Sequence, residues 1–177
     1  MILRHKLFLI SILTISVIGM NGCTPSQDDS AMIGQPAPGF TLPDLAGNEF
    51  GLEQARGNVV LIDFWATWCP PCLRALPHIQ AIHARFEGKG LIVLGINNED
   101  PAKVSQFATE KGLTFRTLSD PSGGAFDAYG VEGIPTTVLI DAEGVVRRVY
   151  VGYTAEEELL SALAELGVAD TPADSHE

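Results

Sequence analysis

The chain has 177 residues and a formal net charge of −11, from 22 acidic residues against 11 Lys and Arg. A length of this order fits one ordinary domain, and the hydrophobic share of 46% is enough to bury a core. These values exclude a disordered protein, and the acidic balance excludes sequence-independent binding of nucleic acid, which needs Lys and Arg against phosphate. Because there are only three cysteines, a disulfide-stapled miniprotein and a four-cysteine zinc site are also excluded.

The first 22 residues predict a signal peptide. Arg4, His5 and Lys6 form a basic start, and an apolar run follows from Leu7 to Met20. The run is shorter than the roughly 20 residues that span a bilayer, so it fits the apolar region of a secretory signal better than an uncleaved anchor. We therefore expect an exported protein.

Cys23 closes this run in the sequence Met20-Asn21-Gly22-Cys23, which resembles the lipobox of bacterial lipoproteins. The resemblance implies that Cys23 carries lipid and anchors the protein in the bacterial cell envelope, facing the periplasm or extracytoplasmic space. Met20 departs from the Leu that is usual there. Residues 23–38 are small, polar and rich in Pro, and we predict a flexible tether over them.

Strands and helices alternate through the predicted domain, residues 39–167, which a frayed tail follows at 168–177. The alternation predicts an α/β fold, with a central mixed sheet flanked by helices. In chain order, the expected elements are a hairpin of strands 40–42 and 49–52, a buried strand 58–65, a helix 70–86, a strand 91–96, a helix 101–112, a strand 114–118, helical turns over 124–129, strands 136–141 and 145–151, and a helix 155–166.

The chemistry is carried by the stretch DFWATWCPPC, residues 63–72. Cys69 falls at the predicted N-cap of a helix, where unpaired backbone N–H groups and the helix dipole favour its thiolate. Cys72 lies one turn further on and is shielded, so it can attack only the sulfur of Cys69. This arrangement predicts a redox pair.

Pro70 and Pro71 occupy the first two helical positions and have no N–H to offer. The nearest remaining donors to the Cys69 sulfur are the amides of Cys72 and Leu73. The two prolines also stiffen the active-site loop, which we expect to tune its redox potential.

Several motifs resemble the thioredoxin superfamily, in particular the membrane-anchored thiol-disulfide oxidoreductases of the TlpA/ResA type. The matches are the WATWCPPC block, Pro77, the sequence Gly133-Ile134-Pro135-Thr136, and Gly152. The helix and strand over residues 101–118 match the insertion of this subfamily. The resemblance covers about residues 33–167 and implies a thioredoxin-like fold with an N-terminal β-hairpin.

The same resemblance implies roles for individual residues. Pro135 would follow a cis peptide bond and face the disulfide, and Trp68, Ile134, Pro135 and Thr136 would form the substrate-docking surface. The chemistry needs no cofactor beyond the Cys69–Cys72 disulfide. No metal site is expected, because His78 and His83 are five residues apart and are interpreted as surface residues.

Asp63 lies in an otherwise apolar strand, six residues before Cys69. A buried carboxylate has a raised pKa and can act as a base near neutral pH, and the family role would be to accept the proton of Cys72. The alternative is a solvent-exposed carboxylate at the end of the strand. Residues 91–97 lack the Lys that thioredoxin pairs with this Asp, and we interpret Glu99 and Asp100 as a solvated loop.

These observations predict a monomeric protein-disulfide reductase that acts outside the cytoplasm, as in cytochrome c maturation. Its partners would be protein thiols and disulfides and a DsbD-like membrane electron donor. A disulfide-donating oxidase is the main alternative. A peroxiredoxin is disfavoured because Ile62 and Ala66 stand where that chemistry needs Pro and Thr or Ser, and a binding-only module commonly lacks a cysteine or the cis-proline that this chain keeps.

Overall fold

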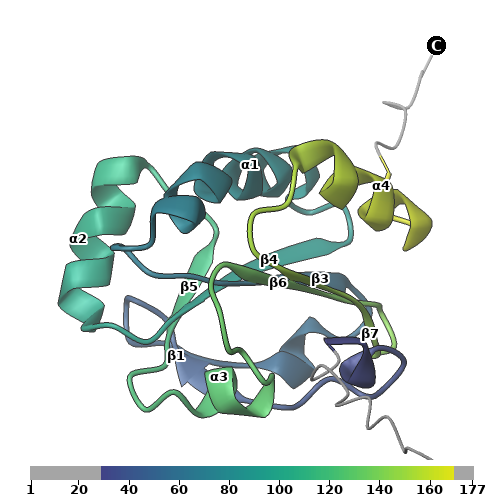
Figure 1. The fold of residues 1–177 in the computed structure, drawn as a ribbon, viewed down its shortest axis with the longest axis horizontal. Helices are drawn as coiled ribbons and strands as arrows, with labels where there is room; N and C mark the ends of the chain where they lie inside the picture. The colour runs from purple at the N-terminus through teal and green to yellow at the C-terminus, as the bar shows by residue number, and fades with distance from the viewer. Residues whose placement is uncertain (1–28, 170–177) are drawn as a thin grey trace, which may run out of the picture.

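The computed structural model describes residues 29–169 (Figure 1). The predicted signal peptide over residues 1–22 and the predicted lipidation site at Cys23 lie outside the described residues, as does the tail from residue 170 onward. Among the helices of the described part, none is long and apolar enough to cross a membrane.

A five-stranded mixed sheet forms the centre of the fold, in the order β5-β4-β3-β6-β7. The first three of these strands are parallel, whereas β6 runs antiparallel to both β3 and β7. Every residue of β3 is buried, as its apolar sequence predicts for a central strand. The strands are β3 (Val59–Phe64), β4 (Leu91–Asn97), β5 (Arg116–Ser119), β6 (Thr136–Ile140) and β7 (Val146–Val151).

Helices lie on both faces of this sheet (Figure 1), which confirms the predicted α/β architecture. On one face lie α1 (Pro70–Phe86), α2 (Pro101–Lys111) and α4 (Glu156–Glu165). On the other lie α3 (Gly124–Ala128), the short helix η2 (Leu52–Ala55) and the predicted hairpin, formed by β1 (Thr41–Pro43) and β2 (Glu49–Gly51).

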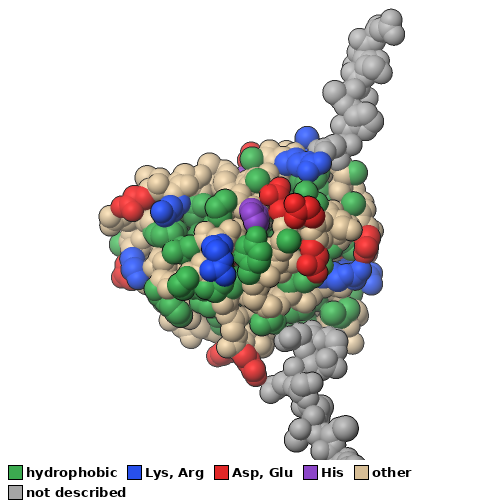
Figure 2. All heavy atoms as spheres, turned by 45° about the horizontal axis from the view of Figure 1, so that its top comes forward, with side chains coloured by type: hydrophobic (Ala, Val, Ile, Leu, Met, Phe, Trp, Pro, Cys, Tyr) green, Lys and Arg blue, Asp and Glu red, His purple; other side chains and the backbone are tan. Residues whose placement is uncertain are grey.

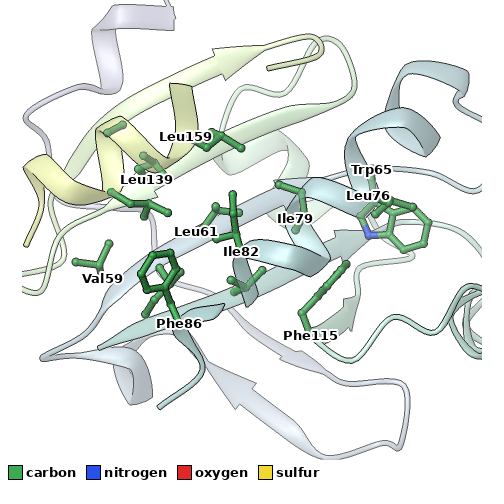
Figure 3. Close-up of a cluster of buried hydrophobic side chains, with 14 of the residues drawn as sticks. Val59, Leu61, Trp65, Leu76, Ile79, Ile82, Phe86, Phe115, Leu139 and Leu159 are labelled. Carbon is green, nitrogen blue, oxygen red and sulfur yellow. The ribbon is translucent and has the colours of Figure 1, made fainter. Parts of the chain in front are cut away.

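Alternate residues of β3 enter two separate hydrophobic cores. Leu61 and Trp65 belong to the core beneath α1, together with Ile79 and Ile82 of that helix (Figure 3). Ile62 and Phe64 face the opposite core, beneath the hairpin and α3. Asp63 has the same parity as Leu61 and Trp65, so the pleat of the strand places it on the α1 side.

Both long helices begin where the sequence predicts. Cys69 is the N-cap of α1, and Pro70 and Pro71 fill its first positions. Asp100 caps α2 by accepting hydrogen bonds from the N–H groups of Ala102 and Lys103. Gly112, with φ of 66°, ends that helix in the left-handed conformation that favours glycine.

The strand predicted over 114–118 begins two residues late, at Arg116. Gln80 of α1 explains this later start, because its side chain binds the Thr114 N–H that strand pairing would otherwise use. Its Oε1 accepts the Thr114 N–H at 2.8 Å, and its Nε2 donates to the Thr114 Oγ1 at 2.8 Å.

The predicted tether is wrong over its last residues. The Gly34 N–H donates to the Val146 carbonyl at 2.8 Å, and the Val146 N–H donates to the Gln35 carbonyl at 3.0 Å. β7 is an edge strand with unpaired backbone groups, and these recruit a segment that has no strand periodicity of its own. The ordered domain therefore starts before residue 39. At its other end it includes Val168, which is buried although we expected fraying from that residue on.

Candidate active site

The two cysteines lie at the first turn of α1, just beyond the carboxyl end of β3. They form a disulfide, with an S–S distance of 2.08 Å and 5.2 Å between the Cα atoms. The Cys72 N–H donates to the Cys69 Sγ at 3.3 Å, as expected. The Leu73 N–H does not, because it donates to the Cys69 carbonyl oxygen at 3.0 Å to continue the helix. One backbone donor therefore serves the sulfur.

The disulfide is almost covered by protein. Cys69 is 2% exposed and Cys72 is 0% exposed, so what reaches the surface belongs to Cys69. Trp68, immediately before it, is 66% exposed. An incoming sulfur nucleophile would therefore meet Cys69 rather than Cys72.

The loop before β6 lies against this disulfide. The Ile134–Pro135 peptide bond is cis, and the Ile134 carbonyl oxygen is 3.6 Å from the Cys69 Sγ. Thr136 is buried and its Oγ1 donates to the Gly133 carbonyl at 2.7 Å, while the Gly152 N–H donates to the Pro135 carbonyl at 2.7 Å. Two segments more than 60 residues apart thus meet at the sulfur.

The residues predicted for substrate docking differ in their exposure to solvent. Trp68 is exposed and Ile134 is half-buried, whereas Pro135 and Thr136 are buried and support the loop from behind. Further large apolar side chains are exposed on the elements that flank the site: Leu73, Val151 and Tyr153. Figure 2 shows hydrophobic groups spread among charged ones over the face that carries α1.

Tyr153 is held by polar contacts to α1. Its hydroxyl lies 3.3 Å from the His78 Nδ1, and the Arg74 guanidinium carbon is 5.8 Å from the centre of its ring. Such contacts give the aromatic ring a fixed place beside the loop of Gly152. A surface of exposed rings and aliphatic groups suits a protein substrate better than a small polar one.

Asp63 is completely buried, which excludes the exposed alternative. Its Oδ1 accepts a hydrogen bond from the Thr137 Oγ1 at 3.2 Å, whereas its Oδ2 has no hydrogen-bond partner. Burial raises the pKa of Asp63 to about 7, and the hydrogen bond from Thr137 only partly opposes it. The neighbouring residue on β4 is Gly95, so that strand offers no cation. The group can hold or release a proton near neutral pH.

Glu99 is not the solvated residue we expected. Its side chain is 11% exposed and its carboxylate accepts hydrogen bonds from the Thr67 N–H at 2.6 Å and the Thr67 Oγ1 at 2.8 Å. It also accepts from the Asn97 Nδ2 at 3.1 Å and the Lys103 Nζ at 2.6 Å. Burial alone would raise the pKa of Glu99, but these donors outweigh it and lower the pKa to about 2. Asp100, by contrast, is exposed as predicted.

A topological signal could have found Glu99. It follows β4, which pairs in parallel with β3, the strand that leads into Cys69. The carboxyl ends of parallel strands meet at one edge of a sheet, where binding and catalytic groups gather.

The two histidines of α1 also differ from one another. His78 is half-buried beside Tyr153, whereas only 13% of the His83 side chain is exposed, and its ring lies edge-on to Phe115 at 6.4 Å. The prediction that His83 is a surface residue is therefore wrong. Within residues 29–169 no group of three or more His, Cys, Asp or Glu side chains could hold a metal ion.

Taken together, these groups can exchange a disulfide with a second dithiol. One sulfur lies at a helix N-terminus and within reach of an incoming protein, the second can resolve a mixed disulfide, and neither step draws on a bound cofactor. The protein is a thiol-disulfide oxidoreductase with a thioredoxin-like fold.

Comparison with known proteins agrees with this class. A sequence model of the AhpC/TSA family matches residues 33–149. The thiol-disulfide oxidoreductase ResA of Geobacillus thermodenitrificans is 34% identical over 142 residues, which cover 80% of this chain and 82% of the relative. The thioredoxin-like protein YneN of Bacillus subtilis is 34% identical over 163 residues, which cover 87% of this chain and 95% of the relative.

Solved structures give the same result. A crystal structure from Chlorobium tepidum, assigned as the thiol:disulfide interchange protein DsbE, has a TM-score of 0.72 and 35% identity, and the match covers 76% of this chain and 98% of that one. The exposed lipoprotein thioredoxin of Streptococcus pneumoniae has a TM-score of 0.65 and 30% identity, over 73% of this chain and 100% of that one. The chain therefore belongs to the AhpC/TSA family, and it is a thiol-disulfide oxidoreductase of the ResA/DsbE type.

Proposed function

We propose that this protein is an extracytoplasmic protein-disulfide reductase. The observation that carries the proposal is the buried Asp63, on the face of β3 that α1 covers and with one oxygen unpaired. Resolution of a mixed disulfide requires Cys72 to lose its proton inside the protein, and a carboxylate whose pKa is about 7 can accept it.

The reductive half-reaction has two steps. The Cys69 thiolate attacks one sulfur of a substrate disulfide, forms a mixed disulfide and releases the first substrate thiolate. Cys72 then transfers its proton to Asp63, and its thiolate attacks the Cys69 sulfur. The Cys69–Cys72 disulfide forms, the mixed disulfide breaks and the second substrate thiolate leaves. The substrate gains two electrons, which an external dithiol must afterwards return to the enzyme.

The N-terminal sequence supports an extracytoplasmic place of action. The basic and apolar segment before Cys23 is typical of an exported lipoprotein, and the solved relative from Streptococcus pneumoniae is an exposed lipoprotein. We infer that lipid on Cys23 holds the domain in the bacterial cell envelope, facing the periplasm or extracytoplasmic space. The domain is strongly acidic, so charge would not add to its hold on an anionic bilayer.

The chemistry supports two classes of partner. Exported proteins with unwanted disulfides are the substrate class, and apocytochrome c, whose paired thiols must be reduced before haem is attached, is a specific member. An oxidised monomer outside the cytoplasm needs its electrons delivered across the membrane, which a DsbD-like membrane donor would do. The exposed apolar residues around Cys69 support docking of both partners at one surface.

The reduction potential tests this proposal. The full chain is equilibrated in defined thiol buffers, and the fluorescence of Trp65 and Trp68 reports the state of the cysteines. A potential near about −270 mV supports a reductase, whereas one near about −120 mV makes the protein a disulfide-donating oxidase. The absence of any reversible two-electron transition would overturn the redox function and favour a binding module.

A further inference from the structure

We propose that Glu99 is a positioning residue that fixes the turn before the nucleophile and thereby shapes the docking surface for protein substrates. The inference rests on the proposed function. The turn consists of residues 66–68, which lie between Trp65, just after β3, and the N-cap cysteine. Nothing in the chemistry of the two sulfurs or of Asp63 requires Glu99.

Glu99 satisfies both donors of Thr67 at once. The Thr67 N–H donates to Oε2 at 2.6 Å, and the Thr67 hydroxyl donates to Oε1 at 2.8 Å. This two-point contact fixes the orientation of the Thr67 peptide, and charge-assisted hydrogen bonds of this kind are among the strongest in proteins. Thr67 is two residues from Cys69, so its orientation is passed directly to the nucleophile.

The carboxylate is itself held from two other elements. Asn97, the last residue of β4, donates its Nδ2 to Oε2 at 3.1 Å and accepts the Glu99 N–H on its Oδ1 at 2.7 Å. Lys103 of α2 donates to Oε1 at 2.6 Å. Since Asn97 is 1% exposed, the anchor is a rigid part of the sheet rather than a surface group.

Ala66, at the start of the turn, is buried in the core, but the part of the turn at Thr67 and Trp68 depends on this anchor. Trp68 is 66% exposed, so its ring is not held by packing. The Cys69 N–H donates to the Ala66 carbonyl at 3.3 Å, which closes the turn at one point only. Without Glu99, we expect Thr67 to reorient and Trp68 to leave the position at which a protein substrate meets it.

The test compares a large and a small disulfide. Glu99→Gln keeps the shape of the side chain but replaces one acceptor oxygen with an NH₂ group that faces a Thr67 donor. We expect the KM for insulin, a protein disulfide, to rise at least fivefold. We expect the rate constant for Ellman's reagent, which needs no docking surface, to change less than twofold. Glu110→Gln is the matched control, because Glu110 is exposed on α2 and accepts a hydrogen bond from Gln106 of the same helix.

Variants of Thr67 keep the test decisive if Glu99→Gln does not fold. Thr67→Ser retains both donors and should behave as the wild type, whereas Thr67→Val loses the hydroxyl and should raise the KM for insulin. In the double variant Glu99→Gln/Thr67→Val, the two increases in KM for insulin should not add, because both substitutions break the same contact. Equal effects on both disulfides, or a KM unchanged in Glu99→Gln and Thr67→Val, would overturn the positioning role. A wild-type protein that reduces neither disulfide would instead overturn the proposed function.

Discussion

Asp63 and Glu99 are two acidic residues at the same edge of the sheet, and their surroundings shift their pKa values in opposite directions. Asp63 has one hydroxyl donor and no cation, so burial dominates and its pKa rises to about 7. Glu99 is also mostly covered, but burial is outweighed by donors from Lys103, Thr67 and Asn97, and its pKa falls to about 2. The number of donors, rather than burial alone, decides which acid can exchange a proton near neutral pH.

The largest expected effect is the pH dependence of the free energy of unfolding that Asp63 causes. Between pH 4 and 7 the folded protein retains the Asp63 proton that the unfolded chain has released, so this group lowers the free energy of unfolding as pH rises. We expect the stability advantage of Asp63→Asn over the wild type to grow from pH 4 to pH 8 and to reach about 4 kcal/mol, at about 1.4 kcal/mol per pKa unit, with about 3 kcal/mol of that growth between pH 5 and pH 8. Urea unfolding of the oxidised proteins measures this.

Asp100→Asn is the control for that prediction, because Asp100 is exposed and caps α2. Its stability difference from the wild type should be nearly the same at pH 5 and pH 8. A difference for Asp63→Asn that also stayed constant with pH would contradict the proposed protonation of Asp63.

The second effect concerns the rate. Asp63→Asn removes the acceptor of the Cys72 proton, and loss of a general base costs about 100-fold or more. We expect resolution of the mixed disulfide to slow by about that factor at pH 7, measured by stopped-flow fluorescence with reduced enzyme. The first step, attack by Cys69, should change little. A slower first step with an unchanged second step would contradict the proposal, because it would mean that Asp63 serves Cys69 rather than Cys72.

The third effect concerns the stability contributed by Glu99. Charge-assisted hydrogen bonds are worth roughly 1.5–3 kcal/mol, so we expect Glu99→Gln to lower the free energy of unfolding by about 2 kcal/mol at pH 7. Because the pKa of Glu99 is lowered from 4.5 to about 2 on folding, the wild type should lose this contribution as pH falls from about 5 to 2. Denaturant unfolding at several pH values tests it, and a deficit that grew on acidification would contradict the assignment.

The smallest effect comes from the exposed member of the Glu99 network. The Lys103 side chain is 57% exposed, and exposed ion pairs contribute about 1 kcal/mol or less. We expect Lys103→Met to lower stability by no more than that, while the pKa of Glu99 rises in a ¹³C NMR titration. A loss as large as that of Glu99→Gln would mean that Lys103, rather than Thr67 and Asn97, holds the carboxylate.

The sequence predicts local features of this molecule better than distant ones. The bounds of α1 follow from Cys69, two prolines and helical spacing, and the burial of Asp63 follows from its apolar neighbours along β3. Glu99 was missed because its partner Thr67 lies 32 residues away, and the polar sequence around Glu99 is typical of a solvated loop. The strand-like pairing of Gly34 and Gln35 was missed for the same reason, since an edge strand distant in sequence supplies the partner.

The pairing of Gly34 and Gln35 with β7 also sets where the N-terminal chain enters the domain relative to the disulfide. Gly34 and Gln35 join β7 at Val146, where the strand starts, whereas its other end, at Val151, lies toward Gly133 of the cis-proline loop. The N-terminal chain therefore enters at the pole of the domain opposite the disulfide. The short helix η1 (Asp29–Met32) packs against β7 and belongs to the folded domain. With lipid on Cys23, as proposed, the six-residue span from Cys23 to Asp29 allows a separation of at most about 22 Å, so the disulfide would point away from the bilayer. Soluble substrates would then reach the disulfide directly, whereas a donor in the membrane would reach it only after the domain rotates toward the bilayer.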